Sequence, residues 1–173
     1  MELLLLTLIF GLLALAWLAI YIGSRMFKVK KINQLVTFLQ KSIPLDDIGS
    51  QPFLLAKQES KQLFPNICLT LLEEEKEIHI ALVQGKSEPT HYQYEFSELK
   101  SVNTSNQSIK RGLWPGISSY EEILRLDFAD GRSFHWVLEN VSSHQRESEN
   151  ALFTKEILSS WYKRLNQAIS REN

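Results

Sequence analysis

The chain has few of the residues that usually carry catalysis or bind metals. Among its 173 residues there is one cysteine, Cys68, and there are four histidines. A single cysteine excludes an intramolecular disulfide and any metal site built from several cysteines, and we expect Cys68 to be a small buried side chain. The histidines, His79, His91, His135 and His144, lack the spacing of helical metal ligands. His79 and His135 alternate with apolar neighbours, which predicts that both face outward on strands.

The sequence motifs of common enzyme classes are also absent. The chain contains no P-loop, no G-x-G-x-x-G turn, no H-E-x-x-H helix and no G-x-S-x-G nucleophile elbow. We therefore expect no catalytic residues, no bound metal and no cofactor, and we expect that the protein is not an enzyme.

Basic charge is scarce over most of the chain and is concentrated in one short segment. The formal net charge is -1, and none of the 19 Lys and Arg residues precedes Arg25. The segment 25–31 holds Arg25, Lys28, Lys30 and Lys31, and the chain beyond it is net acidic. Because a nucleic-acid-binding domain usually carries a clustered basic excess, we expect no nucleic-acid partner.

What the chain has in abundance is an apolar run near its beginning. Leu3 to Ile22 contains no charged residue, and as a helix of about 30 Å it is long enough to cross the hydrocarbon core of a bilayer. Trp17 and Tyr21 lie near its end, where aromatic side chains favour the membrane interface. We therefore predict a transmembrane helix within residues 1–24. Its predicted anchor residues include Leu3, Leu12, Trp17, Tyr21 and Ile22.

The charges around this run predict its orientation. The basic segment 25–31 follows it directly, whereas Glu2 is the only charged side chain before it. Basic residues stay on the cytoplasmic side, so we predict a single-pass protein of a bacterial inner (plasma) membrane, with the N-terminus outside. The same basic residues could also hold anionic lipid headgroups. The alternative interpretations are a cleaved signal peptide, with Ala14-Leu15-Ala16 as the cleavage site, and a buried helix of a soluble core.

Residues 25–52 form a juxtamembrane segment with its own pattern. Over residues 31–43 the apolar residues recur at the spacing of one helix face: Ile32, Leu35, Val36, Leu39 and Ile43. This amphipathic helix could lie on the membrane surface, pair with a partner helix or pack on its own domain. Residues 44–52 are predicted to be a linker.

From residue 53 onward the sequence is typical of β-strands. Short apolar or alternating segments between turn residues predict strands at 53–57, 67–72, 78–83, 92–96 and 99–102. Glu73 to Glu77 is predicted to be an exposed hairpin tip. Residues 103–119 are polar and are predicted to be a long loop, in which four residues could contact a membrane or a partner: Lys110, Arg111, Leu113 and Trp114. An apolar face that includes Trp161 and Tyr162 predicts a final helix at about 150–169.

One hairpin can be predicted to the residue. Leu124, Leu126 and Phe128 alternate with polar residues on one strand, and Phe134 and Trp136 do so on the next. A two-residue loop at Asp130-Gly131 would place these apolar sets on opposite faces. A three-residue loop instead pairs Leu126 with Phe134 and Leu124 with Trp136, with Gly131 in the left-handed conformation that such a loop requires. We predict the second register.

Two stretches, YEFSELKSV at Tyr94–Val102 and LRLDFADG at Leu124–Gly131, are similar to segments of bacterial pleckstrin-homology-like (PH-like) domains. Together with the order of elements, the chain resembles such a domain over about residues 53–170. The resemblance implies a bent antiparallel sheet or barrel of six or seven strands, plugged by the C-terminal helix. Members that bind phosphoinositides use basic residues near the first strands, whereas the tip here is acidic. The alternative folds are another small helix-capped β-barrel and an α+β sheet with one covering helix.

These features predict a mainly β protein with a C-terminal α-helix behind a transmembrane helix, organised as residues 1–24, 25–52 and 53–173. The expected function is a membrane-anchored binding or scaffold module that presents its PH-like domain at the cytoplasmic membrane surface to a protein partner in the same membrane. The alternative is a structural subunit of a larger membrane complex that packs through its transmembrane helix.

Overall fold

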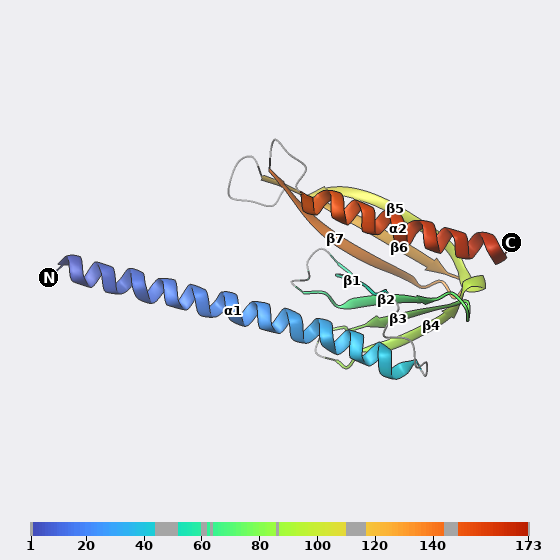
Figure 1. The fold of residues 1–173 in the computed structure, drawn as a ribbon, viewed down its shortest axis with the longest axis horizontal. Coiled ribbons are helices and arrows are strands. Elements are labelled where there is room, and N and C mark those ends of the chain that lie inside the picture. The colour runs from blue at the N-terminus through green and yellow to red at the C-terminus, as the bar shows by residue number, and fades with distance from the viewer. Residues whose placement is uncertain are drawn as a thin grey trace.

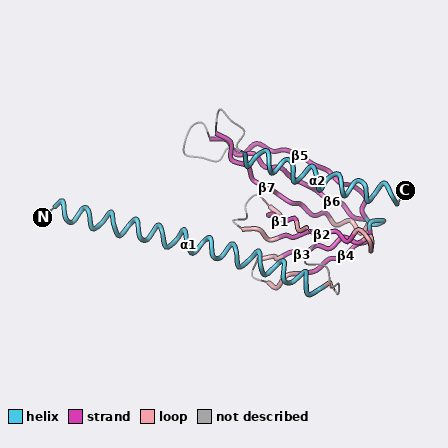
Figure 2. Tube along the Cα trace, viewed as in Figure 1, coloured by secondary structure: helices cyan, strands magenta, loops and turns pink. Residues whose placement is uncertain are grey.

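A computed structural model describes residues 2–43, 52–59, 62, 64–85, 87–109, 117–143 and 149–172. A long helix, α1 (Glu2–Ser42), precedes seven antiparallel strands, and a second helix, α2 (Glu149–Glu172), follows them. The strands form two sheets, and Figure 2 shows them between the two helices, with α1 beside the first sheet and α2 beside the second. The prediction of a mainly β protein with an apolar N-terminal helix and a C-terminal helix is confirmed.

The first sheet has the order β1-β2-β3-β4 and the second has the order β5-β6-β7. Their bounds are β1 Leu54–Ala56, β2 Ile67–Leu72, β3 Glu77–Leu82, β4 Thr90–Glu95, β5 Leu99–Ile109, β6 Ile117–Phe128 and β7 Ser133–Ser143, with a 3-10 turn, η2 (Phe96–Glu98), before β5. The sheets are joined along one edge by Lys57 and Val137, whose backbones exchange two hydrogen bonds of 2.8 and 3.4 Å. This isolated bridge links the end of β1 to β7 and so connects the two sheets.

The main core fills the space between the two sheets and is completed by α2. Trp136 and Phe128 are its largest fully buried side chains, and the ring of Phe128 stacks on that of Tyr94 at 3.9 Å. On α2, Trp161 and Leu165 are buried in this core, whereas Tyr162 is exposed. The predicted apolar face of the helix is therefore real, with Tyr162 at its solvent edge.

The predicted hairpin register is confirmed. Leu126 pairs with Phe134 and Leu124 with Trp136. The Phe128 N–H donates to the Arg132 carbonyl at 2.9 Å, and Gly131 has a φ of 85°. A left-handed residue at this point is what the three-residue loop requires, and glycine adopts it without a steric penalty.

The polar region 103–119 is a correction, because most of it is strand and not loop. β5 continues to Ile109 and β6 begins at Ile117, and the two strands are paired from Ser101–Asp127 to Ile109–Ser119. The side chains of residues 103–107 are all exposed, so no apolar alternation marks this part of the strand. The proposed contact residues Lys110, Arg111, Leu113 and Trp114 lie outside the described residues.

The segment 31–43 also differs from the prediction, because it is not a separate short helix: no break divides it from the apolar helix. It forms the last turns of α1 and packs on its own domain, which was one of the three alternatives. Leu35, Leu39 and Ile43 bury their side chains against the outer face of the first sheet, next to Cys68 and Ala81. The expectation for Cys68 is confirmed, because it is fully buried and burial raises the pKa of its thiol to about 12.

The N-terminal half of α1 runs away from the domain, as Figure 1 shows. By length and composition, α1 is the one helix in the described part of the chain that could cross a membrane. The predicted anchor residues Leu12, Trp17, Tyr21 and Ile22 are all exposed to the surroundings, and the side chain of Leu3 lies outside the described residues. An apolar surface of this kind is stable in a lipid environment and unfavourable in water.

Candidate functional site

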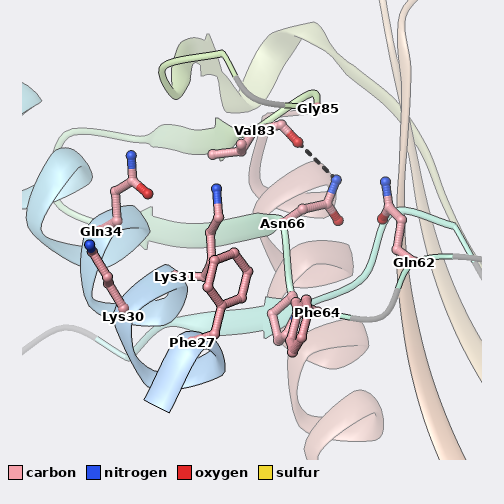
Figure 3. Close-up of a pocket in the computed structure, with 10 residues that line it drawn as sticks. Phe27, Lys30, Lys31, Gln34, Gln62, Phe64, Asn66, Val83 and Gly85 are labelled. Atoms are coloured by element: carbon pink, nitrogen blue, oxygen red, sulfur yellow. Dashed lines mark hydrogen bonds between the residues drawn. The ribbon is translucent and has the colours of Figure 1, made fainter. Parts of the chain in front are cut away.

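A groove of about 750 Å³ lies where α1 meets the domain. One wall belongs to α1 and consists of Phe27, Lys30, Lys31 and Gln34. The other wall is formed mainly by the chain before β2 and the end of β3, through Gln62, Phe64, Asn66 and Val83 (Figure 3). The groove therefore joins residues that lie far apart in the sequence.

The α1 wall follows directly from helix geometry. Phe27, Lys30, Lys31 and Gln34 have the spacing i, i+3, i+4 and i+7, which places them on one face of the helix. One position further along, the same side of the helix begins to bury apolar residues, starting at Leu35. The packing of Leu35 and its neighbours on the sheet therefore fixes the direction in which the two lysines project.

Hydrogen bonds hold the opposite wall in place. The Asn66 side-chain amide donates to the Val83 carbonyl at 3.1 Å, and the Gln58 backbone N–H donates to the Asn66 side-chain oxygen at 2.8 Å. The side-chain oxygen of Gln62 accepts hydrogen bonds from the backbone N–H groups of Gln58 and Glu59, at 3.0 and 3.2 Å. The Gln62 NH2 group takes no part in these two bonds.

One end of the groove is aromatic. The rings of Phe27 and Phe64 pack edge to face with centroids 5.0 Å apart, and the Lys31 ammonium lies 5.9 Å from the centroid of the Phe27 ring. Figure 3 shows the two phenylalanines together at one end, with the Lys31 side chain extending away from them along the groove.

The charge in the groove has one sign. Its described lining holds two cations, Lys30 and Lys31, and no carboxylate. A second, smaller groove of about 530 Å³ shares Lys30 and Gln34 but also includes Lys41 and Glu88, so its charge is mixed. Of the two, the first has the chemistry to hold an anion.

The predicted basic residues divide between the groove and the free helix surface. Lys30 and Lys31 line the groove, whereas Arg25 and Lys28 are exposed on α1 and are not part of the lining. Sequence reasoning missed Phe64, Gln62 and Asn66, because they lie outside regular elements and have no periodic pattern. The i+3 and i+4 spacing of Phe27 with the lysines was the available signal.

Two of the histidines form a second polar cluster, on the outer face of the first sheet. His79 Nδ1 lies 3.0 Å from His91 Nε2, and His79 Nε2 lies 2.9 Å from a carboxylate oxygen of Glu77. His79 lies on the outer face of its strand, as predicted, but it is only 2 % exposed and therefore not open to solvent. It shares that face with Cys68 and Ala81, on which α1 packs. His135, also predicted to face outward, is half-buried.

Among the residues that the structure describes, no three His, Cys, Asp or Glu side chains are placed so that together they could hold a metal ion. Burial lowers the pKa of His79, against the opposing effect of Glu77, and burial with the charge of His79 lowers the pKa of His91. The arrangement therefore favours neutral imidazoles in the folded protein.

Acidification is expected to destabilise the protein through this cluster. Because the folded pKa of His79 lies below its ordinary value of 6.5, the unfolded chain binds the proton more readily. The stabilisation is present above pH 6.5 and is lost as the pH falls below it. Urea unfolding of the full-length protein in mild detergent at pH 7.5 and pH 5.5 measures the loss, and His79→Gln should reduce it. An equal loss in both proteins would contradict this assignment.

Comparison of the chain with protein-family models, with curated proteins and with solved structures finds no match.

Proposed function

We propose that this chain is a single-pass membrane protein that holds a PH-like binding or scaffold domain at the cytoplasmic surface of a bacterial inner membrane. The observation that carries the proposal is the continuity of α1. The same helix exposes apolar side chains from Phe10 to Ile22 and buries Leu35 and Leu39 against the domain in its last turns. A domain attached in this way is held at a fixed height above the bilayer.

The support for a PH-like domain is the arrangement of its elements. Four strands form one antiparallel sheet, three form the next, and the C-terminal helix packs its apolar face into the core between them. This is the architecture that the resemblance of YEFSELKSV and LRLDFADG implies. We assign the domain to binding, since the described groove combines two cations with side-chain amides and aromatic rings, which are groups that hold a ligand.

The mechanism that we propose is tethering. Anchoring converts the encounter with a membrane-bound partner from a search in three dimensions into one within the bilayer plane, which raises the effective concentration of the domain. Figure 1 shows the free ends of β5 and β6 pointing to the same side as the N-terminal half of α1. The β5–β6 ribbon and the edge of β4 are the surfaces that we propose for a protein partner.

Affinity purification from native membranes in mild detergent tests this function. We expect the full-length chain to retain a membrane protein in stoichiometric amount. The control is a chain that ends after Ile43, which keeps the helix and lacks the strands. We expect it to lose the partner, because the domain carries the binding surface. A partner that stays with the helix alone would contradict the proposal and favour a structural subunit that packs through α1.

A further inference from the structure

We propose that the groove between α1 and residues 62–66 binds the headgroup of an anionic phospholipid from the membrane in which α1 is anchored. This inference rests on the proposed function, because it requires that α1 crosses a bilayer. It adds a ligand of defined chemistry to a domain whose acidic hairpin tip does not fit inositol phosphates.

The groove begins at the outer edge of the headgroup layer. A helix rises about 1.5 Å per residue, so Phe27 lies about 8 Å and Lys31 about 14 Å beyond Ile22 along the axis. The headgroup layer extends about 5 to 8 Å beyond the hydrocarbon core. Phe27 is therefore level with the headgroups, whereas Lys31 lies about 6 Å above them, with its side chain extending away from the phenylalanines (Figure 3). A lipid that reaches the lysines must therefore rise partly out of the layer.

The order of the side chains along the groove is that of a phospholipid. Phe27 and its partner Phe64 come first on leaving the membrane and offer an apolar surface to the glycerol and the beginning of the acyl chains. Lys30 and Lys31 follow one turn later and offer two ammonium groups to the phosphate. The side-chain amides of Gln34 and Gln62 can add hydrogen bonds to the headgroup.

The charge of the groove selects an anionic lipid. Two lysines with no carboxylate in the described lining leave a positive site, which a zwitterionic headgroup neutralises less well than a headgroup with net negative charge. A soluble phosphate compound would match the lysines but would leave the aromatic end unoccupied. An acidic peptide that filled the whole groove would have to displace the headgroups that lie at the level of Phe27.

Native mass spectrometry of the full-length protein in mild detergent tests the proposal. The probes are phosphatidylglycerol, phosphatidylcholine and inorganic phosphate, each titrated separately. We expect one phosphatidylglycerol per chain, bound at least ten-fold more tightly than phosphatidylcholine, and no effect of millimolar phosphate. The variant Lys30→Gln/Lys31→Gln should bind phosphatidylglycerol about 25-fold more weakly, equivalent to about 1 kcal/mol for each lysine.

The matched control is Arg25→Gln/Lys28→Gln, which removes the same charge from the same helix outside the groove. We expect it to lower the affinity less than three-fold. Equal losses of phosphatidylglycerol affinity in the two double variants would contradict the proposal. They would show that lipid is attracted by the basic residues of α1 in general and not bound in the groove. If inorganic phosphate displaced phosphatidylglycerol, the groove would be a site for soluble anions and the lipid proposal would be wrong. A failure of the lipid proposal can be told apart from a failure of the proposed membrane anchoring. In the second case the unchanged chain would be absent from washed membranes.

Discussion

A chain in which both Leu12 and Leu13 are replaced by Asp is expected to leave the membrane. Both residues lie at the centre of the apolar run and expose more than half of their side-chain surface, at 59 % and 61 %. An Asp at the centre of a membrane-spanning helix costs about 3 kcal/mol, and each lost Leu removes a further contribution of about 0.5 kcal/mol. Two substitutions therefore shift insertion by about 7 kcal/mol, which is enough to abolish it for a single helix.

Flotation in a density gradient measures this result without confusing membranes with aggregates, because membranes rise and aggregates sink. We expect the unchanged chain and the control variant Leu12→Ala/Leu13→Ala to float, and the Asp variant to remain at the bottom or in the soluble fraction. An Asp variant that floats like the unchanged chain would show that this segment is not the anchor. Protease added outside intact cells should leave a C-terminal tag uncut, and digestion of the tag would reverse the proposed orientation.

The core of the fold was predictable wherever the sequence alternates. Leu124, Leu126, Phe134 and Trp136 define their own register, because a shift of one residue would move every one of them to the opposite face of the sheet. The bounds of β2 agree with the predicted 67–72, where turns on both sides delimit an apolar run. In these segments local preference and tertiary burial favour the same structure.

The sequence-based predictions failed where the burial of side chains does not follow the two-residue alternation of a strand. The outer part of β5 is held by backbone hydrogen bonds to β6 while its side chains remain exposed, so its sequence resembles that of a loop. His79 alternates in the way a solvent-facing residue does, but it is buried, on the face of the sheet where α1 packs against Cys68 and Ala81. A helix so distant in the sequence leaves no local signal on the strand that it buries.

Only the α1 wall of the groove could be predicted from the sequence, for the same reason. Lys30 and Lys31 were singled out because they follow an apolar run, which is a local feature. Phe64 and Gln62 join them only because α1 docks on the sheet, and nothing in the residues around them indicates that contact. The site is therefore a consequence of the docking of α1, and its integrity depends on the residues that hold the helix in place.

Leu39→Ala is expected to weaken that docking strongly. Leu39 is fully buried and packs in a cluster with Leu35, Ile43 and Cys68, separate from the main core between the sheets. Truncating a buried Leu to Ala costs about 2 to 5 kcal/mol, since transfer free energy is lost and a cavity remains. Because the main core is untouched, we expect this loss to appear first as release of α1 from the sheet.

Cys68 is a built-in reporter of this release, because it is the one cysteine of the chain and lies fully buried in the same cluster. Its thiol reacts with a labelling reagent only when α1 opens, so a loss of about 2 to 5 kcal/mol should raise the labelling rate about 30- to 4,000-fold. The control is Thr37→Ala, which alters an exposed residue of the same helix and should leave the rate unchanged. An unchanged rate in Leu39→Ala would contradict independent docking of α1.

The labelling of Cys68 and the binding of lipid are both linked to the docking of α1. Lys31 reaches the groove only when α1 is docked, so the apparent affinity for phosphatidylglycerol scales with the docked fraction. If the docked state of Leu39→Ala is still the major one, its lipid affinity should be close to that of the unchanged chain even though Cys68 labels faster. If undocking dominates, lipid binding should fall, and added phosphatidylglycerol should slow the labelling of Cys68. That reciprocal effect follows from linkage between two sites that share one helix.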